Sequence, residues 1–300
     1  MSKIIVTGGA GFIGSHIVEA LVASGHEIHV IDDLSAGHEE RVPASATLHV
    51  ADIRDRAAIE PLFSGIDYVF HLAAIPQVQY SIEHPEETER VNVEGTLNVL
   101  EASRKAGVKR VIYSASSAAY GDQTVMPLIE TMPAKPKSPY GAQKYIGEIL
   151  CQAWGETYGL STVSLRYFNV FGPRQSDKGA YASVIAHFLK QKRESKPLVI
   201  IGDGEQTRDF VHVRDVAQAN LLAMESGKVG KGEVINIGTG KKYSVNYIAS
   251  LFGGPIEHAP PRVEPRDSLA DISKAKELLG WAPKQEFEPS IKELLASLSK

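Results

Sequence analysis

The stretch Lys3-Ile4-Ile5-Val6-Thr7-Gly8-Gly9-Ala10-Gly11-Phe12-Ile13-Gly14 decides the fold expected for this chain of 300 residues. Residues 3–7 are apolar and β-branched, as in a buried strand, and apolar residues at helical spacing follow over 17–22. Glycines allow a tight turn and leave room for a pyrophosphate at the helix N-terminus, where free N–H groups favour anions. This order of strand, glycine turn and helix predicts dinucleotide binding; the alternative is a turn that needs glycine only for packing.

The second predicted strand, residues 27–31, ends in Asp32 and Asp33. Asp32 lies 18 positions after Gly14 (32 − 14), where a carboxylate can bind a ribose 2′-hydroxyl and would repel a 2′-phosphate. Because Arg41 is nine positions further on instead of adjacent, we expect NAD to be preferred over NADP. Asp33 either belongs to the same site or only caps a turn.

Strand and helix patterns alternate along the first half of the chain. Further strands are expected at residues 47–53, 68–74, 109–114, 160–165, 198–204 and 234–238, and helices at 57–63, 88–107, 181–190, 215–224, 272–280 and 289–298. Such alternation predicts an α/β fold with a doubly wound parallel sheet of the Rossmann type, whose ligands lie at the carboxyl ends of the strands. We expect this domain at 1–170, rejoined by about 211–240, and a smaller, interleaved α/β substrate-binding domain at 171–300.

Composition excludes several classes of protein. The net charge is −4 and no run of five basic residues occurs, so no nucleic-acid partner is expected. The single cysteine, Cys151, excludes an intramolecular disulfide, and no His and Cys cluster has metal-ligand spacing. No apolar run approaches the roughly 20 residues of a membrane span, and a strand starting at Lys3 leaves no room for a signal peptide. We therefore expect a cytoplasmic protein without a membrane partner or a metal.

The chemistry is expected at Ser138-Pro139-Tyr140-Gly141-Ala142-Gln143-Lys144. Tyr140 and Lys144 share one helix face because side chains at i and i+4 are stacked, and Pro139 suits a helix start. An ammonium one turn away favours the phenolate, so this Tyr could exchange a proton near neutral pH. The alternative is a surface Tyr beside a solvated Lys.

Five motifs, in this order, resemble the extended short-chain dehydrogenase/reductase family, and among its members UDP-glucose 4-epimerase-like nucleotide-sugar epimerases. They are Thr7-Gly8-Gly9-Ala10-Gly11-Phe12-Ile13-Gly14, His71-Leu72-Ala73-Ala74, the serine motif ending in Tyr120-Gly121, Tyr140-x-x-x-Lys144, and Arg166-Tyr167-Phe168-Asn169. The likeness covers nearly the whole chain. It implies an isomerase that oxidises and re-reduces carbon 4 of a UDP-sugar with NAD. Alternatives are a UDP-glucuronate 4-epimerase and a non-catalytic NAD-binding scaffold or sensor.

The resemblance also implies the site residues. The catalytic residues would be Tyr140, Lys144 and Ser116, the last counted back four from Tyr120. Those that would bind NAD are Gly8, Gly11, Phe12, Ile13, Gly14, Asp32, Asp33, Leu34, Ser35, Gly37, Asp52, Ile53, Leu72, Ala73, Ala74, Asn92, Ser114, Tyr140, Lys144, Tyr167 and Val170. Asn92 would bind backbone near the site, unless it is a surface residue. Ser117 and Ala118 stand where dehydratases and decarboxylases of the family carry acidic residues, which disfavours those chemistries.

The substrate would be held by Gln77, Ser116, Tyr140, Asn169, Ser183, Val184, Val199, Arg208, Arg262, Arg266 and Ser268. Arg208 would bind the diphosphate, or else pair with Asp209 or Asp215. The segment 260–271 is one residue shorter than is usual in the family, so Arg262, which we favour, and Arg266 are both candidates for a phosphate. A small residue at Ser268 would admit a 2-N-acetyl group. His212 is expected to be a packed or capping residue. Relatives commonly dimerise through the helices corresponding to 88–107 and 140–157, which implies a homodimer.

Overall fold

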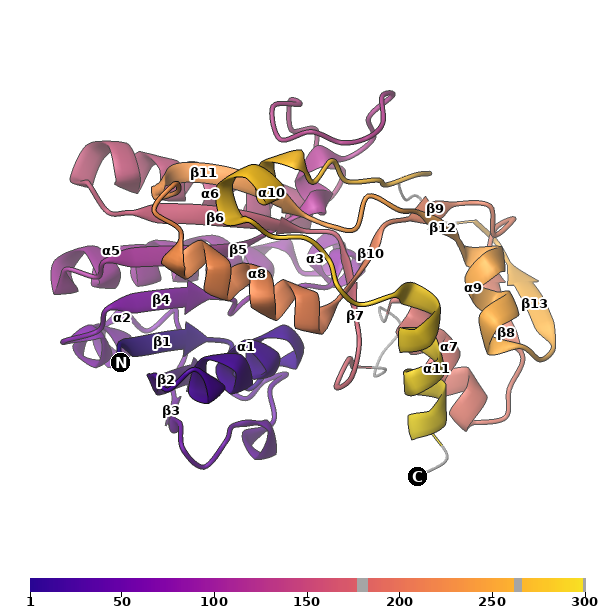
Figure 1. The fold of residues 1–300 in the computed structure, drawn as a ribbon, viewed down its shortest axis with the longest axis horizontal. Helices are drawn as coiled ribbons and strands as arrows, with labels where there is room; N and C mark the ends of the chain where they lie inside the picture. The colour runs from indigo at the N-terminus through magenta and orange to yellow at the C-terminus, as the bar shows by residue number, and fades with distance from the viewer. Residues whose placement is uncertain (177–182, 262–265, 299–300) are drawn as a thin grey trace.

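The structure, a computed structural model, describes residues 1–176, 183–261 and 266–298. It has a larger lobe built on one parallel sheet, here called the sheet lobe, and a smaller lobe at the carboxyl ends of its strands, here called the arm (Figure 1). The N-terminus lies at the far end of the sheet lobe, and the last described helix, α11, lies in the arm.

The sheet has seven strands in the order β11-β6-β5-β4-β1-β2-β3, all paired in parallel. Their bounds are β1 Lys3–Thr7, β2 Glu27–Asp32, β3 Thr47–Val50, β4 Tyr68–His71, β5 Arg110–Ser116, β6 Thr162–Tyr167 and β11 Lys231–Ile237. The expected doubly wound parallel sheet is confirmed. The order reverses between β1 and β4, and the crevice beside that switch point is where this fold binds ligands.

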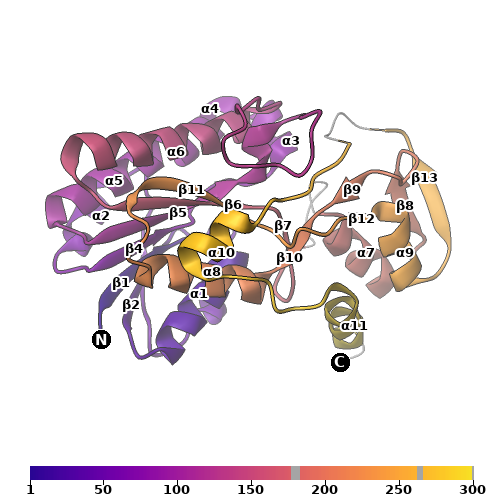
Figure 2. The same ribbon diagram turned by 45° about the horizontal axis from the view of Figure 1, so that its top comes forward.

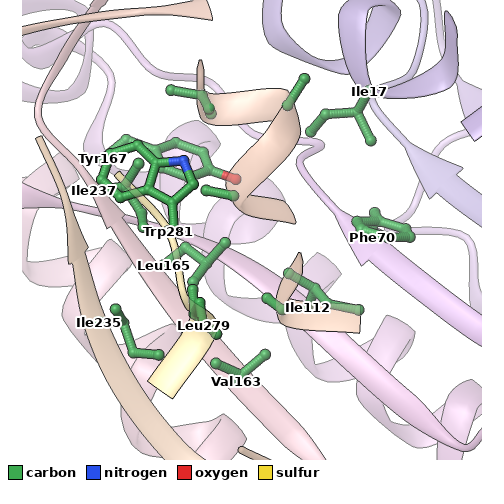
Figure 3. Close-up of a cluster of buried hydrophobic side chains, with 14 of the residues drawn as sticks. Ile17, Phe70, Ile112, Val163, Leu165, Tyr167, Ile235, Ile237, Leu279 and Trp281 are labelled. Carbon is green, nitrogen blue, oxygen red and sulfur yellow. The ribbon is translucent and has the colours of Figure 1, made fainter. Parts of the chain in front are cut away.

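Helices cover both faces of the sheet. One face carries α1 (Phe12–Ala23), α8 (Val213–Glu225) and α10 (Ser273–Leu279), and the other carries α2 (Arg56–Ile59), α5 (Gly95–Ala106) and α6 (Pro139–Tyr158). Neighbouring strand residues alternate between two buried cores: Ile4 and Val6 face α1, whereas Ile5 faces α5. Figure 3 shows the first core, where Trp281 after α10 packs beside Tyr167 and Ile237. Helix α10 thus packs on the sheet lobe, although it lies in the range expected for the substrate domain.

The arm consists of short helices and two-stranded sheets around its own apolar core (Figure 2). Its elements are β7 Asn169–Phe171, α7 Val184–Arg193, β8 Leu198–Ile201, β9 Thr207–Arg208, β10 Phe210–His212, β12 Tyr243–Ser244, α9 Val245–Phe252, β13 Ile256–Ala259 and α11 Phe287–Ser297. The pairs are β7 with β10, β9 with β12, and β8 with β13. Part of the helix expected at 181–190 lies outside the described residues.

The chain passes between the two lobes at five links. They run from β6 through β7 to α7, from β9 through β10 to α8, from β11 through β12 to α9, from β13 to α10, and from α10 to α11. The arm is therefore built from several separate segments of the chain and is not one contiguous domain added to the sheet lobe.

Two helices expected as continuous are interrupted. The segment 88–107 comprises the end of α4 (Pro85–Glu89), a π-helical turn η3 (Arg90–Glu94) and α5, and the segment 57–63 divides into α2 and a 3₁₀ turn η2 (Glu60–Phe63). Periodicity cannot distinguish a π turn from α helix, because the local apolar spacing is similar. Two further 3₁₀ turns are η1 (Glu39–Arg41) and η4 (Ser117–Tyr120), and α3 spans Val78–Glu83. None of the helices in the described ranges is both long and apolar enough to cross a membrane.

Candidate active site

The glycine turn after β1 lies against the end of β4, at the switch point of the sheet. A Cβ atom on Gly8 would lie 2.7 Å from the Ala73 amide nitrogen, and one on Gly14 would lie 2.1 Å from the Gly8 carbonyl oxygen. Helix α1 then begins at Phe12 without a side-chain cap on its first N–H groups. Close backbone approach and uncapped N–H groups at a helix start form a cradle that fits a pyrophosphate.

Asp32 ends β2 beside this turn and is almost fully buried. Its carboxylate accepts hydrogen bonds from the amides of Ala10 (3.0 Å) and Leu34 (2.9 Å). Burial raises its pKa and these bonds lower it partway. Asp33 accepts from the amide and hydroxyl of Ser35, which is the turn-capping role considered for it. The loop passes close to Asp32, since a Cβ on Gly37 would lie 2.6 Å from its Oδ1. These residues suit the adenosine end of NAD.

The three predicted catalytic side chains meet at the carboxyl end of β5. Ser116 is the last residue of β5, and its side chain lies close enough to Tyr140 to lower the pKa of the phenol. Helix α6 begins at Pro139, as predicted, and Ser138 caps it by accepting from the Gly141 amide at 3.1 Å. One turn later Lys144 is buried and donates to the Ser114 carbonyl at 2.8 Å.

The charges at this centre differ from the expectation. Burial raises the pKa of the Tyr140 phenol, and the hydrogen bond with Ser116 lowers it partway. Burial also lowers the pKa of Lys144 to about 8. Among the described hydrogen bonds, the Lys144 ammonium donates to a carbonyl and none joins it to the phenol. Ser116, and not Lys144, is therefore the neighbour that lowers the pKa of the Tyr140 phenol.

Tyr167 lies on the face of the sheet that α8 covers, with its ring in the core shown in Figure 3. Its hydroxyl is 3.1 Å from the Ser114 hydroxyl and 2.7 Å from the Asn220 amide nitrogen. A buried chain of polar groups thus runs from α8 to the strand end whose carbonyl holds Lys144.

Asn92 is buried in the π turn and binds backbone near the site, which was one of the two interpretations of this residue. Its side chain accepts from the Ile75 amide at 2.8 Å and donates to the Ile75 carbonyl at 3.1 Å and to Gln143 at 2.9 Å. These bonds tie the π turn to the loop after β4 and to α6. Asn92 therefore shapes the wall of the crevice through protein contacts.

A second polar chain, not anticipated from the sequence, crosses the end of β4. The His71 ring lies 2.7 Å from the Thr7 hydroxyl through Nδ1 and 2.9 Å from the Thr96 hydroxyl through Nε2. The Thr7 hydroxyl oxygen accepts from the Leu72 and Ala73 amides, so it must donate to Nδ1, and Nε2 then carries the proton. Burial lowers the His71 pKa to about 3, so the ring is neutral.

A buried ion pair was also missed. Arg166 donates to both carboxylate oxygens of Glu148, at 2.8 and 2.6 Å, and lies over the Tyr120 ring at 4.4 Å. Glu148 continues the face of α6 that carries Tyr140 and Lys144. A charged residue on a buried helix face needs a partner, and this spacing was the available signal.

In the arm, three predicted substrate residues converge. Asn169 donates to the Asp209 carbonyl (3.0 Å) and to the Ser268 hydroxyl (3.3 Å). Arg208 donates to the carbonyls of Thr207 and Arg266. The carboxylate of Asp209, once considered a partner of Arg208, accepts from backbone amides and a threonine instead.

The other predicted residues are more dispersed. Ser183 caps α7, which starts at Val184, and the Val199 amide donates to Gln191 (3.2 Å). Arg266 forms an exposed ion pair with Asp203 (2.9 Å), whereas Arg262 lies outside the described residues. His212 caps α8 by accepting from the Arg214 amide, as predicted.

The remaining predicted residues lie mostly near the ends of strands. Gln77 precedes α3, and Ala74 follows β4. Asp52 and Ile53 follow β3, where Asp52 pairs with Arg54, and Val170 lies in β7. Within the described ranges, no group of three or more His, Cys, Asp or Glu side chains could hold a metal.

Comparison with known proteins gives one family and close structural neighbours. The model of the NAD dependent epimerase/dehydratase family matches residues 4–238. The UDP-glucose 4-epimerase of Thermotoga maritima, solved with UDP-glucose, is 41% identical, has a TM-score of 0.94, and the match covers 99% of this chain and 98% of that one. The UDP-N-acetylglucosamine 4-epimerase of Methanobrevibacter ruminantium, solved with UDP-N-acetylmuramic acid, is 37% identical (TM-score 0.93; 98% and 97% covered). The UDP-glucuronic acid 4-epimerase of Bacillus cereus, solved with UDP-glucuronic acid and NAD, is 32% identical (TM-score 0.91; 99% of both chains covered).

Proposed function

Since the chain belongs to the NAD-dependent epimerase/dehydratase family, we propose that it inverts carbon 4 of a UDP-sugar, with UDP-glucose and UDP-galactose as one substrate pair. The observation that supports this most directly is that Ser116, at the carboxyl end of β5, lies beside Tyr140 and lowers the pKa of its phenol, next to the buried Lys144. A hydroxyl beside a partly buried phenol suits proton exchange with a sugar hydroxyl.

The proton steps fall to the protein. Tyr140 takes the proton of the 4-hydroxyl and returns it after the sugar has turned, and Ser116 hydrogen-bonds the reacting oxygen at both stages. When bound, NAD supplies the hydride acceptor and donor, and its oxidised ring brings the positive charge that favours a phenolate. Lys144, held by the Ser114 carbonyl, lies one turn from Tyr140 and would bind the nicotinamide ribose.

The arm would hold the nucleotide while the sugar turns. Asn169 and Arg208 lie on β7 and β9, and they converge with Ser268. We assign the diphosphate to Arg208, with Arg262 or Arg266 as the second cation. A planar guanidinium suits two-point phosphate binding. Anchoring the nucleotide keeps the 4-keto sugar from being released before it is reduced.

The small side chain of Ser268 supports acceptance of N-acetylated sugars as well. Its hydroxyl oxygen accepts from the Asn169 side chain and from the Asp209 amide, so this small side chain is directed toward neighbouring protein groups. A uronate is the second candidate, because the B. cereus enzyme acts on one and matches the whole chain.

The test is incubation of the NAD-loaded protein separately with UDP-glucose, UDP-N-acetylglucosamine and UDP-glucuronate, followed by proton NMR of the anomeric signals. Interconversion of the first two without accumulation of NADH is expected. Conversion of UDP-glucuronate alone would move the assignment to the uronate. Steady NADH production would indicate a dehydrogenase, and no change in any sugar would leave a binding protein.

We also propose that two chains associate through α5 and α6. The outer faces of these helices expose Leu97, Ile146 and Ile149, the last to 46%. Ile149→Lys should convert a dimer into a monomer in sedimentation velocity, whereas Ile256→Lys in the arm, at an equally exposed isoleucine, should not. A wild-type monomer would refute the assembly. Location in the cytoplasm stays a prediction.

A further inference from the structure

The carboxylate of Asp209 is fully buried, and it is hydrogen-bonded to two of the links between the lobes. Oδ1 accepts from the Thr239 amide and hydroxyl, both at 2.7 Å. Oδ2 accepts from the amides of Gly240 and Ala270, both at 3.0 Å. These donors belong to the link after β11 and to the link before α10, so one side chain joins two links that are distant in sequence.

The backbone of Asp209 binds the predicted substrate residues. Its carbonyl accepts from the amide (3.1 Å) and the side chain (3.0 Å) of Asn169, and its amide donates to the Ser268 hydroxyl (3.4 Å). With the side-chain bonds, Asp209 thus connects four of the five links. The packing there is close, because a Cβ on Gly238 would lie 2.6 Å from the Ala270 Cβ and 2.9 Å from Asp209 Oδ2.

The four hydrogen bonds favour an ionised carboxylate, which can accept all of them. All come from neutral donors, and each oxygen accepts two of them. Burial raises the Asp209 pKa and these bonds lower it partway. An asparagine has the same shape but only one acceptor oxygen, so its NH₂ group would face at least one backbone N–H, that of Thr239 on one side or those of Gly240 and Ala270 on the other. Unpaired buried donors are strongly unfavourable, so the links would separate.

We propose that Asp209 is a positioning residue, which sets the places of Asn169 and Ser268 and thereby the affinity and selectivity for the nucleotide-sugar. This inference rests on the proposed function for its consequence in binding. The coupling of the four links through Asp209 is a property of the fold and does not depend on the proposed function.

Asp215 provides a matched control. It is equally buried, and its carboxylate accepts from the amides of Lys284 and Gln285, each at 3.0 Å. Burial raises its pKa as well. It secures the fifth link, between α10 and α11, and carries none of the predicted substrate residues. Asp215→Asn should therefore destabilise the protein without disturbing the sugar pocket.

The first measurement is hydrogen–deuterium exchange of the NAD-loaded protein, read by mass spectrometry. In Asp209→Asn, peptides covering 238–241, 268–271 and 168–171 should lose protection together, by about tenfold or more in exchange rate. In Asp215→Asn the loss should be confined to peptides around 282–287. Unchanged exchange of the first three peptides in Asp209→Asn would overturn the proposal. Thr239→Val, which removes one donor and keeps its amide, covers the case in which Asp209→Asn does not fold, and should loosen the same peptides by a smaller factor.

The second measurement is calorimetric titration with UDP, together with KM and kcat for the substrate found above. Asp209→Asn should raise the UDP Kd and the KM about tenfold or more, and change the ratio of activities on plain and N-acetylated sugars. Bound NAD should stay at the wild-type level. If Asp215→Asn, at equal thermal stability, weakened UDP binding and raised the KM as much as Asp209→Asn does, the role of Asp209 would be structural only. If wild type turned over no UDP-sugar, the proposed function would fail, and the exchange measurement would still decide whether Asp209 couples the links.

Discussion

In the sheet lobe, Gly8, Asp32 and Ser116 each stand at the end of the strand that precedes them, whereas in the arm Asn169, Arg208 and Ser268 come from three separate segments. The first group is placed by parallel strands that all end at one edge. The second is placed by hydrogen bonds between residues 99 positions apart, as for Asn169 and Ser268. Regular sheet geometry makes a site predictable from local pattern, and a site built from long-range polar contacts is not.

The largest effect should come from Tyr140, the residue of the sheet lobe that exchanges the proton. Tyr140→Phe removes the hydroxyl that exchanges the proton, so kcat should fall by roughly 10² to 10⁴. Thermal stability should change little, because the backbone and ring stay in place. Tyr145→Phe, on the next turn of α6, is the matched control and should retain activity. Near-normal turnover in Tyr140→Phe would exclude Tyr140 as the residue that exchanges the proton.

Buried and exposed ion pairs offer the next contrast. Arg166→Met leaves Glu148 buried without its partner and should lower the free energy of unfolding by about 3–5 kcal/mol. Glu293→Gln breaks the pair between α11 and Arg214, whose side chains are about half exposed, and should lower it by less than about 1 kcal/mol. Urea unfolding of both variants measures the difference. Similar values for the two variants would mean that burial does not determine how much an ion pair contributes to the stability of this protein.

Lys144 should make the stability of the sheet lobe depend on pH. Burial lowers its pKa from the ordinary 10.5 to about 8. Between these values the unfolded chain retains a proton that the folded chain has lost, so rising pH stabilises the folded state, and below pH 8 the burial of the charge is fully unfavourable. Relative to Lys144→Met, the wild-type apoprotein should gain about 2 kcal/mol in the free energy of unfolding from pH 7.5 to pH 9.5. A difference that does not vary with pH would contradict this.

The smallest effect should concern selectivity and should come from the arm. Ser268→Tyr fills the space beside Asn169, so conversion of an N-acetylated sugar should fall at least about tenfold, while conversion of the plain sugar stays within about threefold. NMR of competing substrates measures the ratio. Ser250→Tyr, on the exposed side of α9, is the control. Equal losses on both sugars would show that the arm holds the nucleotide without selecting the sugar.

Most of the fold followed from sequence because it is local. The strand, glycine turn and helix at 3–23, the start of α6 at Pro139 and the parallel sheet were all predicted, since apolar period and turn residues determine them. The π turn at 90–94 was not, because its apolar spacing is similar to that of an α helix.

The candidate site also has a part that could be predicted from the sequence and a part that could not. Helix spacing placed Tyr140 and Lys144 together, and Ser116 was implied by the resemblance to the family. The sequence did not reveal that Lys144 binds the Ser114 carbonyl, or that Arg166 and Glu148 pair, although Arg166 stood in a quoted motif. Asp209 was considered only as a partner of Arg208, because its actual donors are 30 and 61 residues away along the chain.

The five links between the lobes also bear on how such a protein can change over evolution. A new arm cannot be acquired by fusing one contiguous gene segment, because exchanging it would need junctions at every link in register with the sheet. Recombination between relatives with different sugar preferences should therefore yield few folded chimaeras, and point substitutions within the arm are the accessible route to a new preference. Libraries made for altered specificity would do better to vary single positions near Asn169 and Ser268 than to shuffle fragments.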